Sequence, residues 1–291
     1  AMRGVVKGLS ENVDELEIYG FHNGYKGLIY GDYRLLTSAD FSGILTKGGT
    51  ILGSSRQPFK QMRVPDENGL DKVEAMKQTY HKLNLDCLVI LGGNGTQKTA
   101  NLLREEGLNV VHLPKTIDND LMFTDHTPGY GSAAKYIAAT IKGIICDSSV
   151  YNLNSVTVVE IMGRHTGWLA GAASLAAGAD CNGPDMILLP ERAFDEEAFL
   201  ARVSQLEKER HTLVIAVSEG VKNKDGEFLC DLVSGPGAVD AFGHKAALSG
   251  TARYLADLIK AHLGCKTRAV ELSVLQRCAS PLASRTDVTE A

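Results

Sequence analysis

The stretch that decides the fold is LDCLVILGGNGTQKTANLLREEGLNVVHLPKTIDND, residues 85–120. Residues 85–91 form an apolar run of strand length that ends at glycines, which predicts a strand buried on both faces. The spacing of residues 97–106 predicts a helix, and residues 109–113 predict a second strand. Two neighbouring parallel strands should therefore release their loops, residues 92–96 and 114–120, at the same edge of a sheet.

The two loops carry different chemistry. The first consists of Gly92, Gly93, Asn94, Gly95 and Thr96. Its glycines let backbone N–H groups approach a phosphate, and the following helix adds partial positive charge at its N-terminus. The second loop supplies Lys115, Thr116, Asp118 and Asp120. Either loop alone is common in turns and caps, but their pairing offers the phosphate cradle, metal ligands and base that phosphoryl transfer requires.

Composition narrows the class of protein. The chain has 291 residues, 44% hydrophobic and 22% charged, which predicts one large or two medium globular domains. A net charge of −5 with mixed signs argues against nucleic acid and anionic membranes as partners. Six scattered cysteines without a CxxC pair predict buried thiols in a reducing compartment. The apolar segment 167–179 is too short to cross a bilayer and predicts a buried helix, so we expect a cytoplasmic protein.

GGNGT followed by PKTIDND resembles the phosphofructokinase family, whose usual forms are GGDGS or GGDGT and PGTIDND or PKTIDND. Further matches follow in the same order over essentially the whole chain: GGTILGSSR at 48–56, MGR at 162–164, IAVSE at 215–219 and VLQR at 274–277. The resemblance implies an α/β fold with two Rossmann-like three-layer domains and mostly parallel sheets. Residues 1–129 plus 277–291 would form the phosphoryl-donor domain, and residues 130–276 the sugar-phosphate domain.

The ends of the chain depart from the family pattern. Residues 1–9 resemble the inside of a helix, which in the family follows a strand and a GGDAPG-type loop that helps to hold the nucleotide. The chain also stops soon after the last motif. It therefore resembles a family member trimmed at both ends.

The resemblance also assigns site residues, motif by motif. Asp118 would be the base, Thr116 would position the acceptor or the transferring group, and Arg164 would complete the catalytic set. The donor would contact Arg56, Gly92, Gly93, Asn94, Gly95, Thr96 and Lys115. Fructose 6-phosphate would contact Thr116, Asp118, Met162, Gly163, Arg164, Glu219, Arg268 and Arg277, with one arginine reaching a neighbouring subunit's site. Asn94 and Asp120 would hold Mg²⁺ through oxygen ligands.

The implied activity is transfer of the terminal phosphoryl group of ATP to the 1-hydroxyl of fructose 6-phosphate, in a homodimer or homotetramer. Two residues bear on the identity of the phosphoryl donor, and they favour different donors. Gly95 stands where diphosphate users carry an acidic residue, which favours ATP. Lys115 is typical of diphosphate users, although some ATP users combine both residues. Diphosphate therefore stays an alternative donor.

Three departures from the family pattern keep other functions open: Asn94 replaces an aspartate, Ser155 an arginine and Val274 a histidine. They leave room for a non-catalytic regulatory subunit that binds sugar phosphate, although retention of Asp118 and Asp120 argues against it. A NAD kinase would share the glycine loop but would leave PKTIDND and MGR unexplained.

Overall fold

The structure is a computed structural model that describes residues 1–45, 47–234, 249–278 and 283–290. The chain divides into two compact units. The first contains Ala1–Thr116, Leu121–Pro128 and Arg285–Ala291, and the second contains Ile117–Asp120 and Gly129–Ser284. These bounds differ from the expected domains in placing residues 117–120, Gly129 and residues 277–284 in the second unit. In the described ranges, no helix combines the length and apolar character that a membrane span needs.

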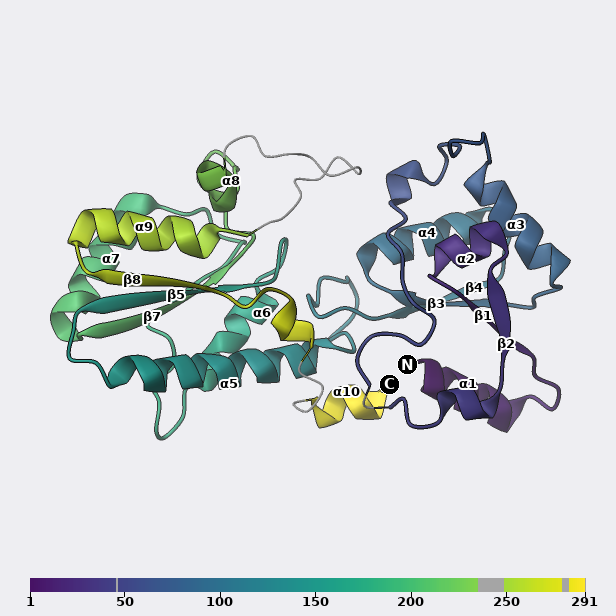
Figure 1. Cartoon of the computed structure of the whole chain (residues 1–291), viewed down its shortest axis with the longest axis horizontal. Helices are drawn as coiled ribbons and strands as arrows, with labels where there is room; N and C mark the ends of the chain where they lie inside the picture. The colour runs from purple at the N-terminus through teal and green to yellow at the C-terminus, as the bar shows by residue number, and fades with distance from the viewer. Residues whose placement is uncertain (46, 235–248, 279–282, 291) are drawn as a thin grey trace. The chain divides into compact units, whose positions relative to one another are not determined.

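The second unit is built on a four-stranded parallel sheet in the order β6-β7-β5-β8 (Figure 1). Its strands are β5 (Ser155–Ile161), β6 (Met186–Leu188), β7 (Thr212–Ser218) and β8 (Lys266–Glu271). Its helices are α5 (Tyr130–Ser149), α6 (Trp168–Gly171), α7 (Glu196–Glu209), α8 (Leu229–Ser234) and α9 (Thr251–Leu263), with 3-10 helices η3 (Ala172–Ala176) and η4 (Ser273–Arg277).

Helices cover both faces of this sheet, because successive side chains of the central strands β5 and β7 point to opposite faces and are mostly apolar on both. Val158 and Ile215 point into a cluster with α7 and α9, whereas Val159 and Val214 point into a cluster with α5, α6 and η3. Figure 1 shows α5 and α9 on opposite faces. The predicted three-layer α/β arrangement is confirmed here.

The first unit contains two smaller sheets. An antiparallel pair joins β1 (Ile18–Phe21) to β2 (Tyr33–Leu36), and a parallel pair joins β3 (Leu88–Gly92) to β4 (Val110–Pro114). Its helices are α1 (Met2–Asn12), α2 (Tyr25–Tyr30), α3 (Lys72–Lys82), α4 (Asn94–Glu105) and α10 (Arg285–Glu290), with η1 (Ser38–Phe41) and η2 (Phe59–Gln61). Parallel pairing dominates the chain, as the fold class predicts.

Burial of β3 is less complete than its apolar sequence predicts. Leu88 is buried and Ile90 packs against the core formed by α2, α3 and α4. Val89 and Leu91, on the opposite face, are only half-buried. The prediction of a strand buried on both faces is therefore wrong for one face.

Three element predictions also need correction. The sequence of residues 266–275 predicts one strand, but the strand ends at Glu271, because Leu272 turns into the core and Ser273 adopts a left-handed backbone with φ +43°. The buried helix expected over 167–179 is two short helices, α6 and η3, with Leu175 exposed. The polar, glycine-rich residues 221–240 predict a loop or hairpin; they form one antiparallel bridge and then α8, which this pattern does not predict, and residues 235–240 lie outside the described residues.

The six cysteines are all free thiols. Cys181 and Cys230 are buried as predicted, and Cys87 and Cys265 are half-buried. Cys146 and Cys278 are exposed, so the prediction of burial is wrong for these two, which lie near the end of a helix and just beyond η4.

Candidate functional site

In the first unit, β3 and β4 are parallel neighbours, and Gly92 pairs with Pro114 in the register. The two loops that follow them therefore leave the same edge of the sheet, as predicted. The Lys115 N–H donates to the Gly92 carbonyl oxygen at 2.9 Å. A Cβ added to Gly93 would lie 3.5 Å from the Cβ of Thr116. The acidic loop thus begins in contact with the glycine loop.

Most of the predicted glycine loop is the first turn of α4, which starts at Asn94 rather than at residue 97. Gly93 is the N-cap and has no side-chain cap, so the first amides of the helix have no partner within the helix. Gly92 has to be glycine, because a Cβ there would lie 2.5 Å from the Cβ of Thr96. Such a helix N-terminus, with little side-chain cover, suits an anion.

A second loop is tied to this turn through the Asn23 region. Asn23 N–H donates to the Leu52 carbonyl at 2.8 Å, and Ser55 Oγ donates to the Asn23 carbonyl at 2.7 Å. Two residues later in the chain, Tyr25 Oη donates to the Thr96 carbonyl at 2.7 Å, and burial raises the pKa of Tyr25, which keeps it protonated. The exposed Arg56 therefore follows a segment anchored close to α4.

The second unit gathers the predicted sugar-phosphate residues at the carboxyl edge of its sheet. Gly163 and Arg164 follow β5, and Glu219 follows β7, the neighbouring parallel strand. Glu219 N–H donates to the Ile161 carbonyl at 2.8 Å, which extends the β5–β7 ladder by one residue. The Gly163 N–H donates to Glu219 Oε1 at 3.3 Å. Two motifs separated by more than fifty residues thus form one site.

The backbone of this site needs two glycines. Gly163 has φ +136°, and a Cβ there would lie 2.5 Å from the Thr166 carbonyl oxygen. Gly220 packs so closely that a Cβ would collide with the Arg164 carbonyl oxygen and lie 2.7 Å from that of Gly163. Ser218 Oγ donates to the Gly163 carbonyl at 2.6 Å and fixes the same turn.

Electrostatics place Asp118 and Arg164 beside Glu219. Burial, together with the charges of Glu160 and Asp118, raises the pKa of Glu219 to about 7. The Gly163 N–H and the Arg164 guanidinium act in the opposite direction. Thr166 Oγ1 donates to the Asp118 carbonyl at 2.9 Å, which ties the half-buried Asp118 to the loop that carries Arg164.

The two predicted arginines of the C-terminal part lie apart from each other. Arg268 lies on the edge strand β8, where it pairs with Thr157 of β5, and its guanidinium lies 3.7 Å from Asp147 Oδ2 and 5.5 Å from the centre of the Tyr151 ring. Within this chain it is therefore not brought to the edge that carries Arg164. Arg277 is exposed at the end of η4, next to the buried Gln276.

Sequence reasoning missed several residues that hold this site in place. Gln276 Oε1 accepts from Met162 N–H at 3.1 Å, and its Nε2 donates to the Ser273 carbonyl at 3.0 Å. Glu160 and Ser218 are buried polar residues at the ends of β5 and β7, which are mostly apolar. A polar residue in such a strand is a signal that could have singled them out, although it does not indicate their partners.

The predicted magnesium ligands belong to different units of the chain. Asn94 is exposed at the first turn of α4, and Asp120 is half-buried in the second unit. Across the described residues, no three His, Cys, Asp or Glu side chains cluster as a metal site. Magnesium usually takes one or two protein oxygens and completes its shell with water and substrate phosphates. Asn94 and Asp120 each offer an oxygen of the kind that Mg²⁺ takes from a protein.

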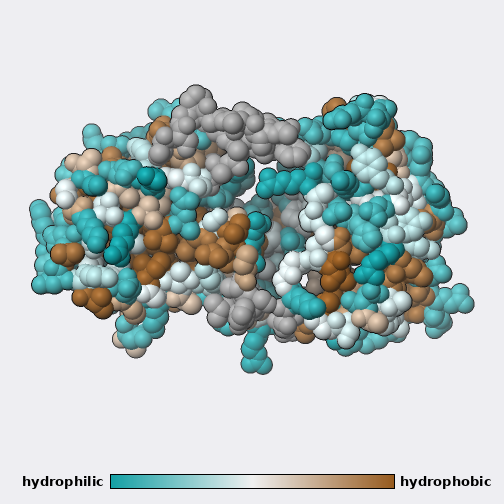
Figure 2. All heavy atoms as spheres, viewed as in Figure 1, coloured by the Kyte–Doolittle hydropathy of each residue, from teal (hydrophilic) through white to brown (hydrophobic). Residues whose placement is uncertain are grey.

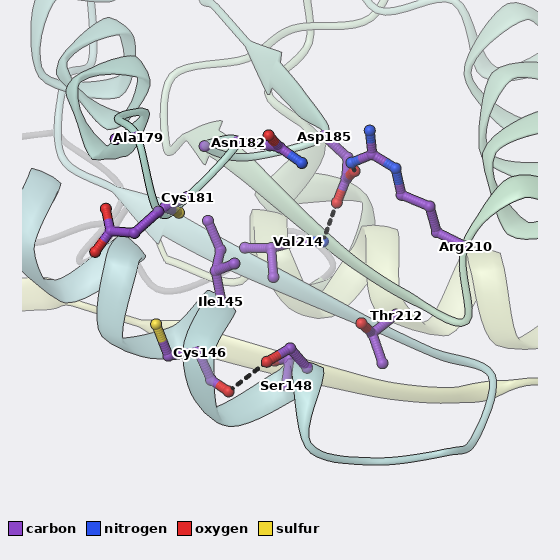
Figure 3. A pocket seen from close by; sticks show the side chains of 13 residues that line it. Ile145, Cys146, Ser148, Ala179, Cys181, Asn182, Asp185, Arg210, Thr212 and Val214 are labelled. Carbon is purple, nitrogen blue, oxygen red and sulfur yellow. Dashed lines mark hydrogen bonds and ion pairs between the residues drawn. The ribbon is translucent and has the colours of Figure 1, made fainter.

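A pocket of about 550 Å³ lies elsewhere on the second unit (Figure 3). It is lined by the end of α5, residues 179–183 and the beginning of β7. Arg210 and Asp185 form an ion pair in it, and Asp185 also accepts from Val214 N–H at 2.8 Å. None of the predicted site residues lines this pocket.

Comparison with known proteins agrees with this geometry. The family model described as Phosphofructokinase matches residues 1–288. An ATP-dependent 6-phosphofructokinase of Spirochaeta thermophila is 41% identical over 97% of this chain and 74% of its own length. A pyrophosphate–fructose 6-phosphate 1-phosphotransferase of Xanthomonas campestris pv. campestris is 38% identical over 95% of this chain and 67% of its own.

Solved structures give the same result. The pyrophosphate-dependent phosphofructokinase from Nitrosospira multiformis superposes with a TM-score of 0.81 at 27% identity, over 99% of this chain and 69% of that one. The fold predicted from the two loops is confirmed by this similarity. The chain belongs to the phosphofructokinase family.

Proposed function

We propose that this protein transfers the terminal phosphoryl group of ATP to the 1-hydroxyl of fructose 6-phosphate. One observation carries the proposal: Asp118, Arg164 and Glu219 lie together in the second unit, and the chain reaches Asp118 only two residues after Thr116. Thr116 itself packs against Gly93 of the glycine loop. Donor-type and acceptor-type residues are thus joined by one short stretch of chain.

Each side chain has a role that its surroundings support. Asp118 accepts the proton of the attacking hydroxyl, since a carboxylate within reach of the acceptor serves as a general base. Arg164 balances negative charge on the phosphoryl group and the sugar phosphate. Glu219 accepts hydrogen bonds from sugar hydroxyls, with Met162 and Gly163 offering backbone and side-chain contacts beside it. Thr116 orients the transferring group.

On the donor side, the first turn of α4 binds the phosphates through its amides, and the exposed Arg56 and Lys115 supply positive charge. Asn94 and Asp120 would hold Mg²⁺, which screens the charge of the donor phosphates. Arg277 binds the sugar phosphate. Arg268 serves the site of a neighbouring subunit, because its position in the first half of β8 keeps it from the carboxyl end of the sheet, where Arg164 and Glu219 lie.

The choice of ATP rests on Gly95. A Cβ added at Gly95 meets nothing within 4 Å, so this position of the first turn is open space into which a nucleotide can extend. The ATP-dependent relative from Spirochaeta thermophila, at 41% identity, supports the same choice. Lys115 and the 38% identical pyrophosphate-dependent relative favour the alternative, a diphosphate-dependent phosphotransferase.

Assays of the purified full chain with fructose 6-phosphate and Mg²⁺ decide between these donors. We expect fructose 1,6-bisphosphate to form at least about tenfold faster with ATP than with diphosphate. Faster turnover with diphosphate would establish the alternative. Binding of fructose 6-phosphate without transfer from either donor would indicate a regulatory subunit, and phosphorylation of NAD a NAD kinase.

The variant Gly95→Asp tests the reason for the choice. Its carboxylate should crowd and repel the nucleotide and lower kcat/KM for ATP by about tenfold or more. Gly95→Ala is the matched control, because its Cβ has room in the structure and adds no charge. Equal ATP use by the Asp and Ala variants would contradict a role for Gly95 in donor choice.

A further inference from the structure

A buried carboxylate near the sugar site has no role so far. Glu160 is the next-to-last residue of β5, and its side chain is only 4% exposed. An isolated carboxylate is expensive to bury, so a folded protein keeps one there only with hydrogen-bond partners. The partners of Glu160 therefore indicate what it does.

Those partners are the first amides of α9. Glu160 Oε2 accepts from Gly250 N–H at 3.2 Å and from Ala252 N–H at 2.8 Å. The N-cap of α9 is Gly250, which has no side chain to cap the helix. Glu160 takes over this function from a different element, and its negative charge lies at the positive end of the helix dipole.

The same turn of α9 holds the sugar-site carboxylate. Thr251, which is fully buried, donates from Oγ1 to the Glu219 carbonyl oxygen at 3.3 Å. On its other side, Glu219 donates its N–H to Ile161, the residue after Glu160. The backbone of Glu219 is thus held both by β5 and by α9, and Glu160 joins those two elements.

We infer that Glu160 is a positioning residue for Glu219: it anchors the first turn of α9 to the end of β5, so that Thr251 holds Glu219 in the orientation that binds the sugar phosphate. This inference rests on the proposed function for the part that concerns fructose 6-phosphate. The anchoring of α9 stands on the hydrogen bonds alone.

Glu160 also acts on Glu219 through its charge, and this gives a readout that a purely structural role would not move. The groups that face Glu219 are Glu160 from β5, Asp118 and the Arg164 guanidinium. Glu271 of β8 lies beside Glu160 in the register. Burial is the main cause of the raised pKa of Glu219, and the Glu160 charge adds to it, so removal of that charge should let Glu219 ionise at lower pH. Burial and the Glu271 charge raise the pKa of Glu160 in turn, so this effect is largest at the high end of the pH range.

Three variants of the full chain test the inference. In Glu160→Gln, the amide oxygen replaces the one oxygen that accepts both N–H groups, so geometry is kept and charge is lost. Glu160→Ala loses both. Glu271→Gln is the matched control, since it removes the same charge from the paired residue of the next strand, does not touch the amides of α9 and keeps an oxygen that can accept from the Ser249 hydroxyl, as Glu271 does at 2.9 Å. Kd and KM for fructose 6-phosphate and kcat are measured for each, with Kd followed from pH 5 to 9.

For Glu160→Ala we expect KM and Kd for fructose 6-phosphate to rise by about tenfold or more, with kcat changed by less than about threefold. For Glu160→Gln we expect near-normal affinity at high pH and a midpoint of the Kd profile shifted to lower pH. The titration of the substrate phosphate is common to all variants and cancels in this difference. Glu271→Gln should leave affinity at high pH within about twofold.

The outcomes separate the two proposals. A wild-type chain that neither binds nor phosphorylates fructose 6-phosphate overturns the proposed function and with it the sugar-site role of Glu160. An active wild type with unchanged affinity in Glu160→Ala overturns the inference alone. If Glu160→Ala does not fold, a fourth variant, Thr251→Val, replaces it: it keeps the shape of the side chain and removes the hydroxyl that donates to the Glu219 carbonyl, and unchanged affinity for fructose 6-phosphate in that variant overturns the inference.

Discussion

Asp118 and Glu219 are two carboxylates of one site, and their different surroundings suit them to different chemical roles. Glu219 is largely desolvated and hydrogen-bonded by the Gly163 N–H, and its pKa rises to about 7. Asp118 lies in the turn that follows Thr116, and Thr166 holds its carbonyl. Neighbouring carboxylates with unlike environments are a common way to separate a base from a binding group.

Replacement of Asp118 by Asn should lower kcat by about 10²–10⁴, because the amide cannot accept the proton of the attacking hydroxyl. Affinity for fructose 6-phosphate should change by less than about threefold, since Arg164 and Glu219 remain. Steady-state kinetics and a binding isotherm with the sugar phosphate check both statements. Unchanged kcat would remove Asp118 from the role of base.

The raised pKa of Glu219 also predicts a trend in stability. A folded-state pKa of about 7, against 4.5 for the ordinary group, means that the folded chain binds this proton more tightly than the unfolded chain. The contribution is therefore present below pH 4.5 and is lost as the pH rises through 7. The Glu219→Gln variant lacks this pH-dependent contribution, because a glutamine side chain does not titrate. The Tm of this variant minus that of wild type should become more positive between pH 5 and pH 8; a flat difference would contradict the raised pKa.

The elements place these side chains by ending where they do. β5 and β7 end side by side, and the turns after them are closed by Gly163 and Gly220. α4 begins directly after β3, so its open first turn lies at the sheet edge where Thr116 also arrives. The sheet and its helices determine where the loop after each strand begins, and glycines allow neighbouring loops to pack closely against each other.

Gly220→Ala should destabilise the protein by about 2 kcal/mol or more, because its Cβ would collide with the Arg164 carbonyl oxygen in a buried turn. It should also weaken binding of fructose 6-phosphate by displacing Arg164. Gly143→Ala is the control: it lies exposed inside α5 with nothing within 4 Å of an added Cβ. It should stabilise the helix by about 0.5–1 kcal/mol. Chemical denaturation measures both, and equal stability of the two variants would contradict the packing of Gly220.

For the whole molecule, Arg268 bears on assembly. It lies in the first half of β8, beside Asp147 and Tyr151, and so away from the carboxyl end of the sheet that carries Arg164. Exposed apolar side chains such as Trp168, Leu175 and Leu275 belong to the same unit, and Figure 2 shows apolar surface on its visible face. Surfaces of this kind are typical of subunit interfaces. Both observations support the proposal of a homodimer or homotetramer with shared sites.

Subunit mixing tests this proposal. Asp118→Asn and Arg268→Ala chains should each be nearly inactive alone. If Arg268 serves the partner's site, a mixed dimer contains one intact site, and a random mixture should recover about a quarter of wild-type activity. Refolding the two variants together and assaying the mixture measures this. No recovery, in a mixture shown to exchange subunits, would place Arg268 outside any shared site.

Regular patterns were readable from the sequence. The β-branched runs at residues 155–161 and 212–218 predict strands, and β5 and β7 have these bounds. The two loops at residues 92–96 and 114–120 predict neighbouring parallel strands that end at the same edge of a sheet, and β3 and β4 pair in this way. Asp71 and Asp195, which cap α3 and α7, mark helix starts in the same local way. These features depend on residues a few positions apart, where periodicity and capping act.

The contacts that hold the site in place could not be predicted from such local patterns. Glu160 meets Ala252 across 92 positions, and Met162 meets Gln276 across 114. Nothing local distinguishes these partners from other polar residues, because their pairing follows from the order β6-β7-β5-β8 and from the packing of α9 on it. Neighbouring residues determine the chemistry of the two loops, and the sequence shows them directly. The contacts that hold Glu219 and Arg164 in place exist only once distant strands lie side by side.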